Sequence, residues 1–204
     1  MKLNWVETLV MNNPVRAGLQ RRREGPGLRG LAPGPTEGAA TLVVGCGRGV
    51  DVEIAFELFK ASTVTAIDLD ERQVERARRR LGSRYGSALE LIACDAAELP
   101  FESGRFGLVL DFGIIHHIPE WKKAVAQISR VLTPGGQFLF EEIPKSELDT
   151  WVYRFFTDHP REDRFNAPDF AQACTEAGLD LGGRIEPFRI LVFNAFRGAA
   201  VKPE

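Results

Sequence analysis

A glycine-rich turn between a short apolar run and a helical pattern constrains the fold of this chain more than any other feature of its sequence. The apolar run at residues 41–44 predicts a strand, and Gly45, Gly47 and Gly49 follow it in the spacing G-x-G-x-G. Residues 50–59 then carry apolar side chains at helical spacing. Such a turn lets backbone N–H groups at the start of a helix approach a ligand closely. The feature therefore predicts a strand–turn–helix unit with a binding site at the turn.

Strand and helix patterns alternate along most of the remaining chain. Further strands are predicted at residues 63–67, 89–93, 106–110, 137–140, 181–185 and 196–201, and helices at residues 71–81, 120–132 and 169–177. Strands that alternate with helices predict a mostly parallel sheet with helices on both faces. The last two predicted strands have no helix between them, so a hairpin joins them and one must run antiparallel. The expected fold class is α/β, with a doubly wound sheet.

Three segments fall outside this alternation. Residues 4–23 predict one or two short helices broken by a proline. Residues 24–38 predict a linker, because they contain five glycines and three prolines, which suit no element interior. Residues 144–166 form a polar and aromatic insertion. We therefore expect an N-terminal helical lid and Gly/Pro-rich linker at residues 1–38, and one α/β domain at residues 39–204 with residues 144–166 as a lid insertion.

Charge and cysteine content exclude several classes of protein. The formal net charge of −2 gives no basic field that would attract nucleic acid, and we interpret the arginine-rich run at residues 76–80 as the solvated face of a helix. Cys46, Cys94 and Cys174 are odd in number and widely spaced, which argues against a disulfide framework and a metal site. Residues 1–10 do not resemble a signal peptide, and no run of about 18 apolar residues predicts a membrane span. We expect a cytoplasmic protein in a reducing compartment.

Carboxylates stand at the ends of the second and third predicted strands. Asp68 lies about 20 residues beyond the glycine turn, where an acidic residue can accept hydrogen bonds from ribose hydroxyl groups. Asp70 is the better cap for the next helix, which leaves Asp68 available to bind. Asp95 can accept a hydrogen bond from an adenine amino group. Val50 occupies the position of the third glycine of a dinucleotide site, which argues against NAD. Together these features predict a nucleoside-shaped crevice at one edge of the sheet.

Five ordered motifs resemble those of class I S-adenosylmethionine-dependent methyltransferases, in particular the small-molecule branch grouped as type 11. They are the segments VGCGRG at residues 44–49, AID at 66–68, ACDAAELPF at 93–101, RFGLV at 105–109 and LTPGG at 132–136. The resemblance implies a Rossmann-like sheet of seven strands whose last strand is antiparallel. It also implies that S-adenosyl-L-methionine is the cofactor and that S-adenosyl-L-homocysteine is the product.

The resemblance further implies which residues hold the cofactor. The glycine turn would line its methionine part, the second strand end its ribose, the third its adenine edge, and the fourth its methionine carboxylate. The implied cofactor-binding residues are Gly45, Cys46, Gly47, Asp68, Leu69, Asp95, Ala96, Phe112 and Gly113. Members of the family often have an acidic residue two positions before the first glycine, and Val43 stands there. Contact to the methionine amino group must then come from backbone, water or elsewhere.

Candidate acceptor residues follow the fourth and fifth predicted strands. In the methyltransferases that this chain resembles, the region of His116 and His117 faces the transferred methyl group. Either histidine is a candidate general base, since the pKa of histidine lies near neutrality, and a structural role for His117 is the alternative. Glu141 is a candidate for orienting an acceptor amine or hydroxyl group, and a salt bridge to an arginine or lysine is the alternative.

The insertion at residues 144–166 supplies further candidates. Its aromatic residues, among them Trp151 and Tyr153, predict contact with a flat or apolar acceptor, and a satellite hydrophobic cluster is the alternative. We expect this insertion and residues 1–23 to form the acceptor pocket together. Pairing of residues 1–23 with a second copy of the chain is the alternative.

These expectations combine into one predicted function. We predict a methyltransferase that moves a methyl group from S-adenosyl-L-methionine to a small-molecule acceptor by in-line displacement. No metal, nucleic acid or membrane is expected as a partner, and the chain is expected to be a monomer or a homodimer. Two alternatives stay open, namely a pseudoenzyme that binds cofactor without turnover and an RNA methyltransferase.

Overall fold

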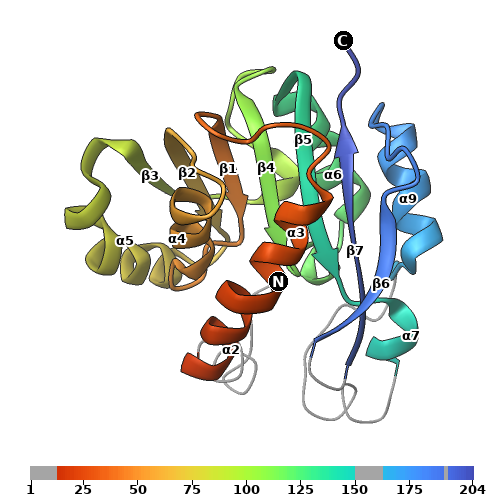
Figure 1. The fold of residues 1–204 in the computed structure, drawn as a ribbon, viewed down its shortest axis with the longest axis horizontal. Coiled ribbons are helices and arrows are strands. Elements are labelled where there is room, and N and C mark those ends of the chain that lie inside the picture. The colour runs from red at the N-terminus through yellow and green to blue at the C-terminus, as the bar shows by residue number, and fades with distance from the viewer. Residues whose placement is uncertain (1–12, 150–162, 191–192) are drawn as a thin grey trace.

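A seven-stranded sheet with helices on both faces forms the body of the protein (Figure 1). The computed structural model describes residues 13–149, 163–190 and 193–204. The strands are β1 (Ala40–Val44), β2 (Thr63–Asp68), β3 (Leu89–Ala93), β4 (Phe106–Phe112), β5 (Leu132–Glu142), β6 (Ile185–Ile190) and β7 (Phe193–Val201). Their order is β3-β2-β1-β4-β5-β7-β6, in which β7 pairs antiparallel with β5 and β6 and the other pairs are parallel. This topology confirms the predicted fold class.

Helical elements connect the strands. They are α2 (Pro14–Leu19), the π-helical η1 (Gln20–Glu24), α3 (Gly25–Leu31), α4 (Val50–Glu57), α5 (Glu71–Tyr85), η2 (Gly86–Ala88), η3 (Ala96–Glu98), η4 (Ile115–His117), α6 (Trp121–Val131), α7 (Lys145–Leu148) and α9 (Ala167–Glu176). Asp70 caps α5 as predicted, because its carboxylate accepts a hydrogen bond of 3.1 Å from the Arg72 N–H. No helix in the described part of the chain is long and apolar enough to cross a membrane.

The sheet buries both of its faces. Successive side chains of a strand point to opposite sides, so Leu42 and Val44 of β1 lie in one hydrophobic core and Val43 lies in another. The first core is completed by α6 and α9, and the second by α3, α4 and α5 (Figure 1). Burial on both faces explains why the central strands are apolar without alternation. It also leaves the strand ends as the place where polar groups gather.

The linker predicted at residues 24–38 is wrong for its first half, because the chain is helical from Pro14 to Leu31. Pro26 lies at the start of α3, directly after the π-helical turn η1. Leu28 is fully buried in the core under α3, which offsets the poor helix propensity of the surrounding glycines. The N-terminal helices are therefore packed on the sheet rather than tethered to it.

The strand predicted at residues 181–185 is also wrong in its position. Gly182 and Gly183 have positive φ angles of 52° and 75° and form a turn, so β6 begins only at Ile185. Pro187 stands within β6, which is tolerated because β6 is an edge strand. The antiparallel hairpin of β6 and β7 is nevertheless present as predicted.

Replacement of Leu28 tests the docking of the N-terminal helices. Leu28→Ala should lower the free energy of unfolding by about 2–5 kcal/mol, since it removes a fully buried side chain from the core. The measurement is a urea unfolding curve of the full chain. Val15→Ala is the control on the same helical segment, because Val15 is 72% exposed and its truncation should change stability by less than about 0.5 kcal/mol. Equal stability of both variants would contradict the docked arrangement.

Candidate cofactor site

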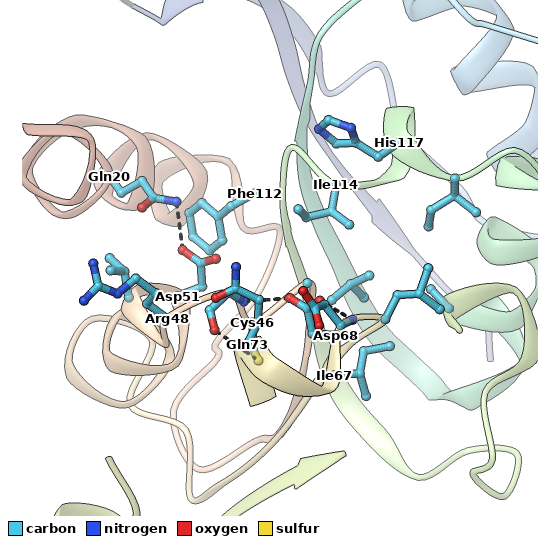
Figure 2. A pocket seen from close by; sticks show the side chains of 18 of the residues that line it. Gln20, Cys46, Arg48, Asp51, Ile67, Asp68, Gln73, Phe112, Ile114 and His117 are labelled. Carbon is cyan, nitrogen blue, oxygen red and sulfur yellow. Dashed lines mark hydrogen bonds between the residues drawn. The ribbon is translucent and has the colours of Figure 1, made fainter. Parts of the chain in front are cut away.

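A pocket of about 310 Å³ opens at the carboxyl edge of the parallel strands (Figure 2). The turns that follow β1, β2, β3 and β4 border it, and the N-terminal segment from Asn13 to Arg21 closes one side. The chain proceeds from β1 to β2 on one side and reaches β4 on the other, so the pocket lies at the switch point of the sheet. This is the usual place for a ligand in an open α/β sheet, and the volume suits a small molecule.

Most of the predicted cofactor residues come together in this pocket. Those that line it are Gly45, Cys46, Gly47, Asp68, Leu69, Asp95, Ala96 and Phe112. Gly113 is adjacent in sequence to Phe112 and does not line the pocket. The residues reach one place because parallel strands end at the same edge of the sheet. That these residues bind the cofactor stays a prediction.

Two positions of the glycine turn lie so close to neighbouring side chains that only glycine fits there. Gly45 has a φ of +74°, and a Cβ atom there would lie 2.3 Å from the side chain of Ile114. Gly49 has a φ of +87°, and a Cβ atom there would lie 2.3 Å from the side chain of Leu81. Any larger residue would push the turn away from the loop after β4 or from α5. The glycines therefore hold the backbone of the turn directly against the pocket.

Asp68 connects the second strand to this turn. Its Oδ2 accepts a hydrogen bond of 2.9 Å from the Gly47 N–H, and its Oδ1 accepts one of 2.9 Å from the Asp70 N–H. Burial raises the pKa of the Asp68 carboxyl group, and the two backbone hydrogen bonds partly oppose that rise. Each carboxylate oxygen can accept a second hydrogen bond. Asp68 can therefore fix the turn and accept hydrogen bonds from a ligand's hydroxyl groups together.

Asp95, like Asp68, both accepts a backbone hydrogen bond and lines the pocket. Its side chain caps η3 by accepting a hydrogen bond of 2.8 Å from the Ala97 N–H, and it also lines the pocket. Ala96 beside it is small and nearly buried. A flat aromatic ring can therefore lie against this end of the pocket with the Asp95 carboxylate at its edge.

The two candidate histidines point to different surroundings. His117 lines the pocket together with Ile114 (Figure 2). His116 instead pairs through Nδ1 with the carboxylate of Glu142, which also accepts a 2.6 Å hydrogen bond from the Ile115 N–H. Burial raises the pKa of Glu142 to about 7. Glu142 thus anchors the loop that carries both histidines, and His117 alone borders the main pocket.

Glu141 does not line the pocket. It is fully buried, and the nearest cation is Arg16 of α2, with an Nη2–Oε1 distance of 3.8 Å. Burial and the nearby Glu24 carboxylate raise the pKa of Glu141 well above its ordinary value. Arg16 therefore lies near Glu141, as the alternative of a salt bridge requires, and a role of Glu141 in acceptor binding stays a prediction. Trp151 and Tyr153 lie outside the described residues.

Sequence reasoning did not single out several polar residues of the pocket wall, among them Gln20, Arg21 and Asp51. Asp51 carried a usable signal, because it lies two residues after the glycine turn in the first turn of α4, where the helix dipole favours a carboxylate. Gln20 and Arg21 carried none, since their place depends on how η1 packs against α4. Residues 1–23 were expected at the acceptor, whereas the described part of that segment borders the pocket beside the glycine turn.

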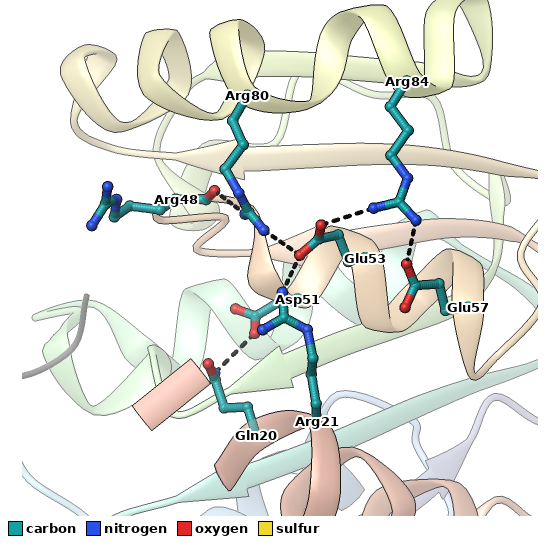
Figure 3. A network of polar contacts seen from close by, with 8 residues as sticks. All are labelled: Gln20, Arg21, Arg48, Asp51, Glu53, Glu57, Arg80 and Arg84. Carbon is teal, nitrogen blue, oxygen red and sulfur yellow. Dashed lines mark hydrogen bonds and ion pairs between the residues drawn. The ribbon is translucent and has the colours of Figure 1, made fainter. Parts of the chain in front are cut away.

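A network of charged side chains fixes η1 beside the pocket (Figure 3). Buried Glu53 of α4 accepts hydrogen bonds from Arg21 of η1 and from Arg80 and Arg84 of α5. Arg80 also donates a 2.7 Å hydrogen bond to the carbonyl oxygen of Arg48 in the glycine turn. The network therefore joins the N-terminal segment, the turn and two helices around one carboxylate.

These features define a class of protein. A switch-point pocket with a glycine turn and strand-end carboxylates is the site of a nucleoside-containing cofactor. Comparison with known proteins names the family, since residues 42–140 match the family described as "Methyltransferase domain". The chain belongs to the S-adenosylmethionine-dependent methyltransferases, and S-adenosyl-L-methionine is its cofactor.

Individual relatives agree with this assignment. The ubiquinone/menaquinone biosynthesis C-methyltransferase UbiE of Methylobacterium nodulans is 33% identical over 188 residues, which cover 90% of this chain and 69% of the relative. The fatty-acid O-methyltransferase of Mycolicibacterium smegmatis is 32% identical over 130 residues, which cover 63% of this chain and 46% of the relative. The chain spans about half of the length of this relative and of the UbiE proteins of Brucella anthropi and Brucella abortus.

A solved structure shares the fold across the whole chain. A methyltransferase from Aquifex aeolicus that depends on S-adenosylmethionine superposes with a TM-score of 0.72 at 19% identity, and the match covers 98% of this chain and all of that chain. At this level of identity the likeness concerns the fold.

Replacement of Asp68 tests the assigned pocket. Asp68→Ala should weaken binding of S-adenosyl-L-homocysteine by about 1–3 kcal/mol, because charge-assisted hydrogen bonds are lost. Isothermal titration calorimetry measures the change. Glu75→Ala is the control, since Glu75 is a half-exposed carboxylate of α5 that pairs with Arg78 outside the pocket. An unchanged affinity of the Asp68 variant would remove the pocket from consideration as the cofactor site.

Proposed function

We propose that the protein transfers the methyl group of S-adenosyl-L-methionine to a small-molecule acceptor. The observation that carries this proposal is the composition of the pocket wall. One side is polar and bears the strand-end carboxylates, and the side formed by the loop after β4 bears Phe112, Ile114, His117 and Ile118. The polar side suits the cofactor, and the more apolar side suits an organic acceptor next to it.

The residues present fit the cofactor. The glycine turn lines the pocket with backbone, since Gly45 packs against Ile114 without room for a Cβ atom, and the carboxylates of Asp68 and Asp95 are hydrogen-bond acceptors for hydroxyl and amino groups. When bound, S-adenosyl-L-methionine supplies a methyl group that its sulfonium centre has already activated. The remaining task of the chain is to align the acceptor at a near-attack distance of about 3–3.5 Å and to exclude water. The helices α2 and η1 cover the pocket on the side of the glycine turn, so they serve that exclusion.

The acceptor decides whether a base is needed. The named relatives differ in this respect, since one methylates a fatty acid on oxygen and the other methylates carbon in quinone biosynthesis. A carboxylate acceptor is already ionised near neutral pH, whereas a phenol or an aromatic carbon must lose a proton. His117 is the candidate base because it borders the pocket, and His116 is a positioning residue through its bond to Glu142.

A turnover assay tests the proposal. The full chain is incubated with S-adenosyl-L-methionine and a panel of fatty acids, hydroquinones, phenols, amines and thiols, and formation of S-adenosyl-L-homocysteine is measured. We expect turnover with at least one class that Asp68→Ala reduces. Binding of S-adenosyl-L-homocysteine without any turnover across the panel would contradict the proposal and would favour a binding protein. Salt-sensitive RNA binding would favour an RNA methyltransferase instead.

Replacement of His117 separates the acceptor classes. For a phenolic or carbon acceptor, His117→Gln should lower kcat by about 100-fold or more, because general base catalysis is lost. For a carboxylate acceptor the same variant should lower kcat only slightly, since no proton is removed. Steady-state kinetics with both classes provide the measurement. A large loss of kcat with the carboxylate acceptor would show that His117 positions the acceptor rather than acting as a base.

A further inference from the structure

Asp51 is a carboxylate of the pocket wall whose charge the protein leaves poorly balanced. It lies in the first turn of α4 and is 7% exposed, and its side chain borders the pocket beside Cys46 and Phe112 (Figure 2). Its Oδ1 accepts a hydrogen bond of 2.9 Å from the Gln20 side chain of η1. A neutral amide orients this carboxylate without neutralising its charge.

The charged groups around Asp51 are already engaged with one another. Arg16 of α2 pairs with Glu24, and Arg21 of η1 pairs with Glu53 of α4. The carboxyl groups of Glu24 and of Asp111 on β4 act against ionisation of Asp51, while Arg16 and Arg21 favour it. Burial has the largest effect, and together these influences raise the pKa of Asp51 to about 8. Among the described residues, Asp51 therefore forms no ion pair with an arginine or lysine, and a ligand's cationic group can take that place.

The position of Asp51 along the pocket indicates which part of the cofactor reaches it. Asp95 follows β3, Asp68 follows β2, and the glycine turn follows β1. Asp51 lies beyond Asp68 on the far side of the turn (Figure 2). With the adenosine part held by Asp68 and Asp95, the amino-acid part extends toward Asp51, and that part carries a primary ammonium group.

We propose that Asp51, oriented by Gln20, binds the α-ammonium group of the cofactor's methionine part. The inference rests on the cofactor site proposed above and assigns one subsite within it. Val43 cannot make this contact, because its apolar side chain is fully buried in the core beneath the turn. The anionic partner of the ammonium group is thus supplied by α4 rather than by β1. Gln20 makes the subsite depend on the docked position of η1.

A pH dependence follows from the state of Asp51. Without ligand its pKa is about 8, so the carboxyl group is mostly protonated at neutral pH. An ammonium ligand favours the ionised form, so binding releases a proton. The affinity for S-adenosyl-L-homocysteine should therefore rise by roughly tenfold per pH unit between pH 6 and 7.5 and level off above 8. Asp51→Asn should remove most of this rise.

The decisive experiment compares two ligands by calorimetry on the full chain at pH 8. One is S-adenosyl-L-homocysteine, and the other is 5′-methylthioadenosine, which lacks the amino-acid part. Asp51→Asn should weaken the first ligand at least tenfold and leave the second within about twofold, since only the first ligand carries the ammonium group. Gln20→Leu should weaken the first ligand several-fold and leave the second unchanged. Glu57→Gln is the control, because it removes a charge from the same helix outside the pocket.

Three results would overturn the assignment. Unchanged affinity of Asp51→Asn for S-adenosyl-L-homocysteine would show that the carboxylate does not bind the ligand. An equal loss for both ligands would show that the substitution distorts the pocket as a whole. Failure of the unsubstituted chain to bind either ligand would overturn the cofactor site itself together with this inference. The unsubstituted chain therefore distinguishes a failure of the cofactor site from a failure of the Asp51 subsite alone.

Discussion

The carboxylate of Asp68 links the turns that follow two neighbouring strands through hydrogen bonds, and the shape of the pocket depends on this link. β1 and β2 run parallel with Val44 beside Ile67, and each strand then enters a turn. By accepting hydrogen bonds from Gly47 and Asp70, Asp68 fixes the glycine turn relative to the start of α5. The approach of Gly45 to Ile114 fixes the same turn relative to the loop after β4. One short segment is thereby held from both sides, and its backbone forms the floor of the site.

Unbalanced negative charge is the second constraint on this site. Several carboxyl groups are buried near the pocket, and Arg16 is the most buried of the cations described there. Buried carboxyl groups favour their neutral forms, which is why the pKa values of Asp51, Asp111 and Glu141 are all raised. Because these pKa values are raised in the folded state, ionisation of the groups destabilises the fold as the pH rises. A cofactor with a sulfonium and an ammonium group is complementary to this charge.

Local patterns in the sequence were sufficient for the sheet and for part of the site. The glycine turn, Asp68 and Asp95 could be predicted because each follows directly from a strand ending at a known edge. The helix at residues 25–31 could not, because its three glycines and its proline disfavour a helix, whereas the burial of Leu28 favours it. The start of β6 depended in the same way on a turn at two adjacent glycines.

Side chains that meet across the fold were the least predictable. Glu141 could be placed at a strand end, but its partner Arg16 lies on a helix far away in the sequence. Gln20 and Asp51 meet only because the charged network at Glu53 docks η1 on α4. No local pattern encodes such a contact, and yet these residues define the end of the pocket next to the glycine turn.

The most direct test of this account is a crystal structure of the full chain with S-adenosyl-L-homocysteine. The distance from the ligand's amino nitrogen to the nearer carboxylate oxygen of Asp51 would be measured, together with the distances from the ribose oxygens to Asp68. The account predicts values of about 2.7–3.2 Å for both contacts, as for ordinary hydrogen bonds. A ligand with its ribose at Asp68 and its amino group turned away from Asp51 would contradict the assigned subsite. A ligand bound outside this pocket would contradict the account as a whole.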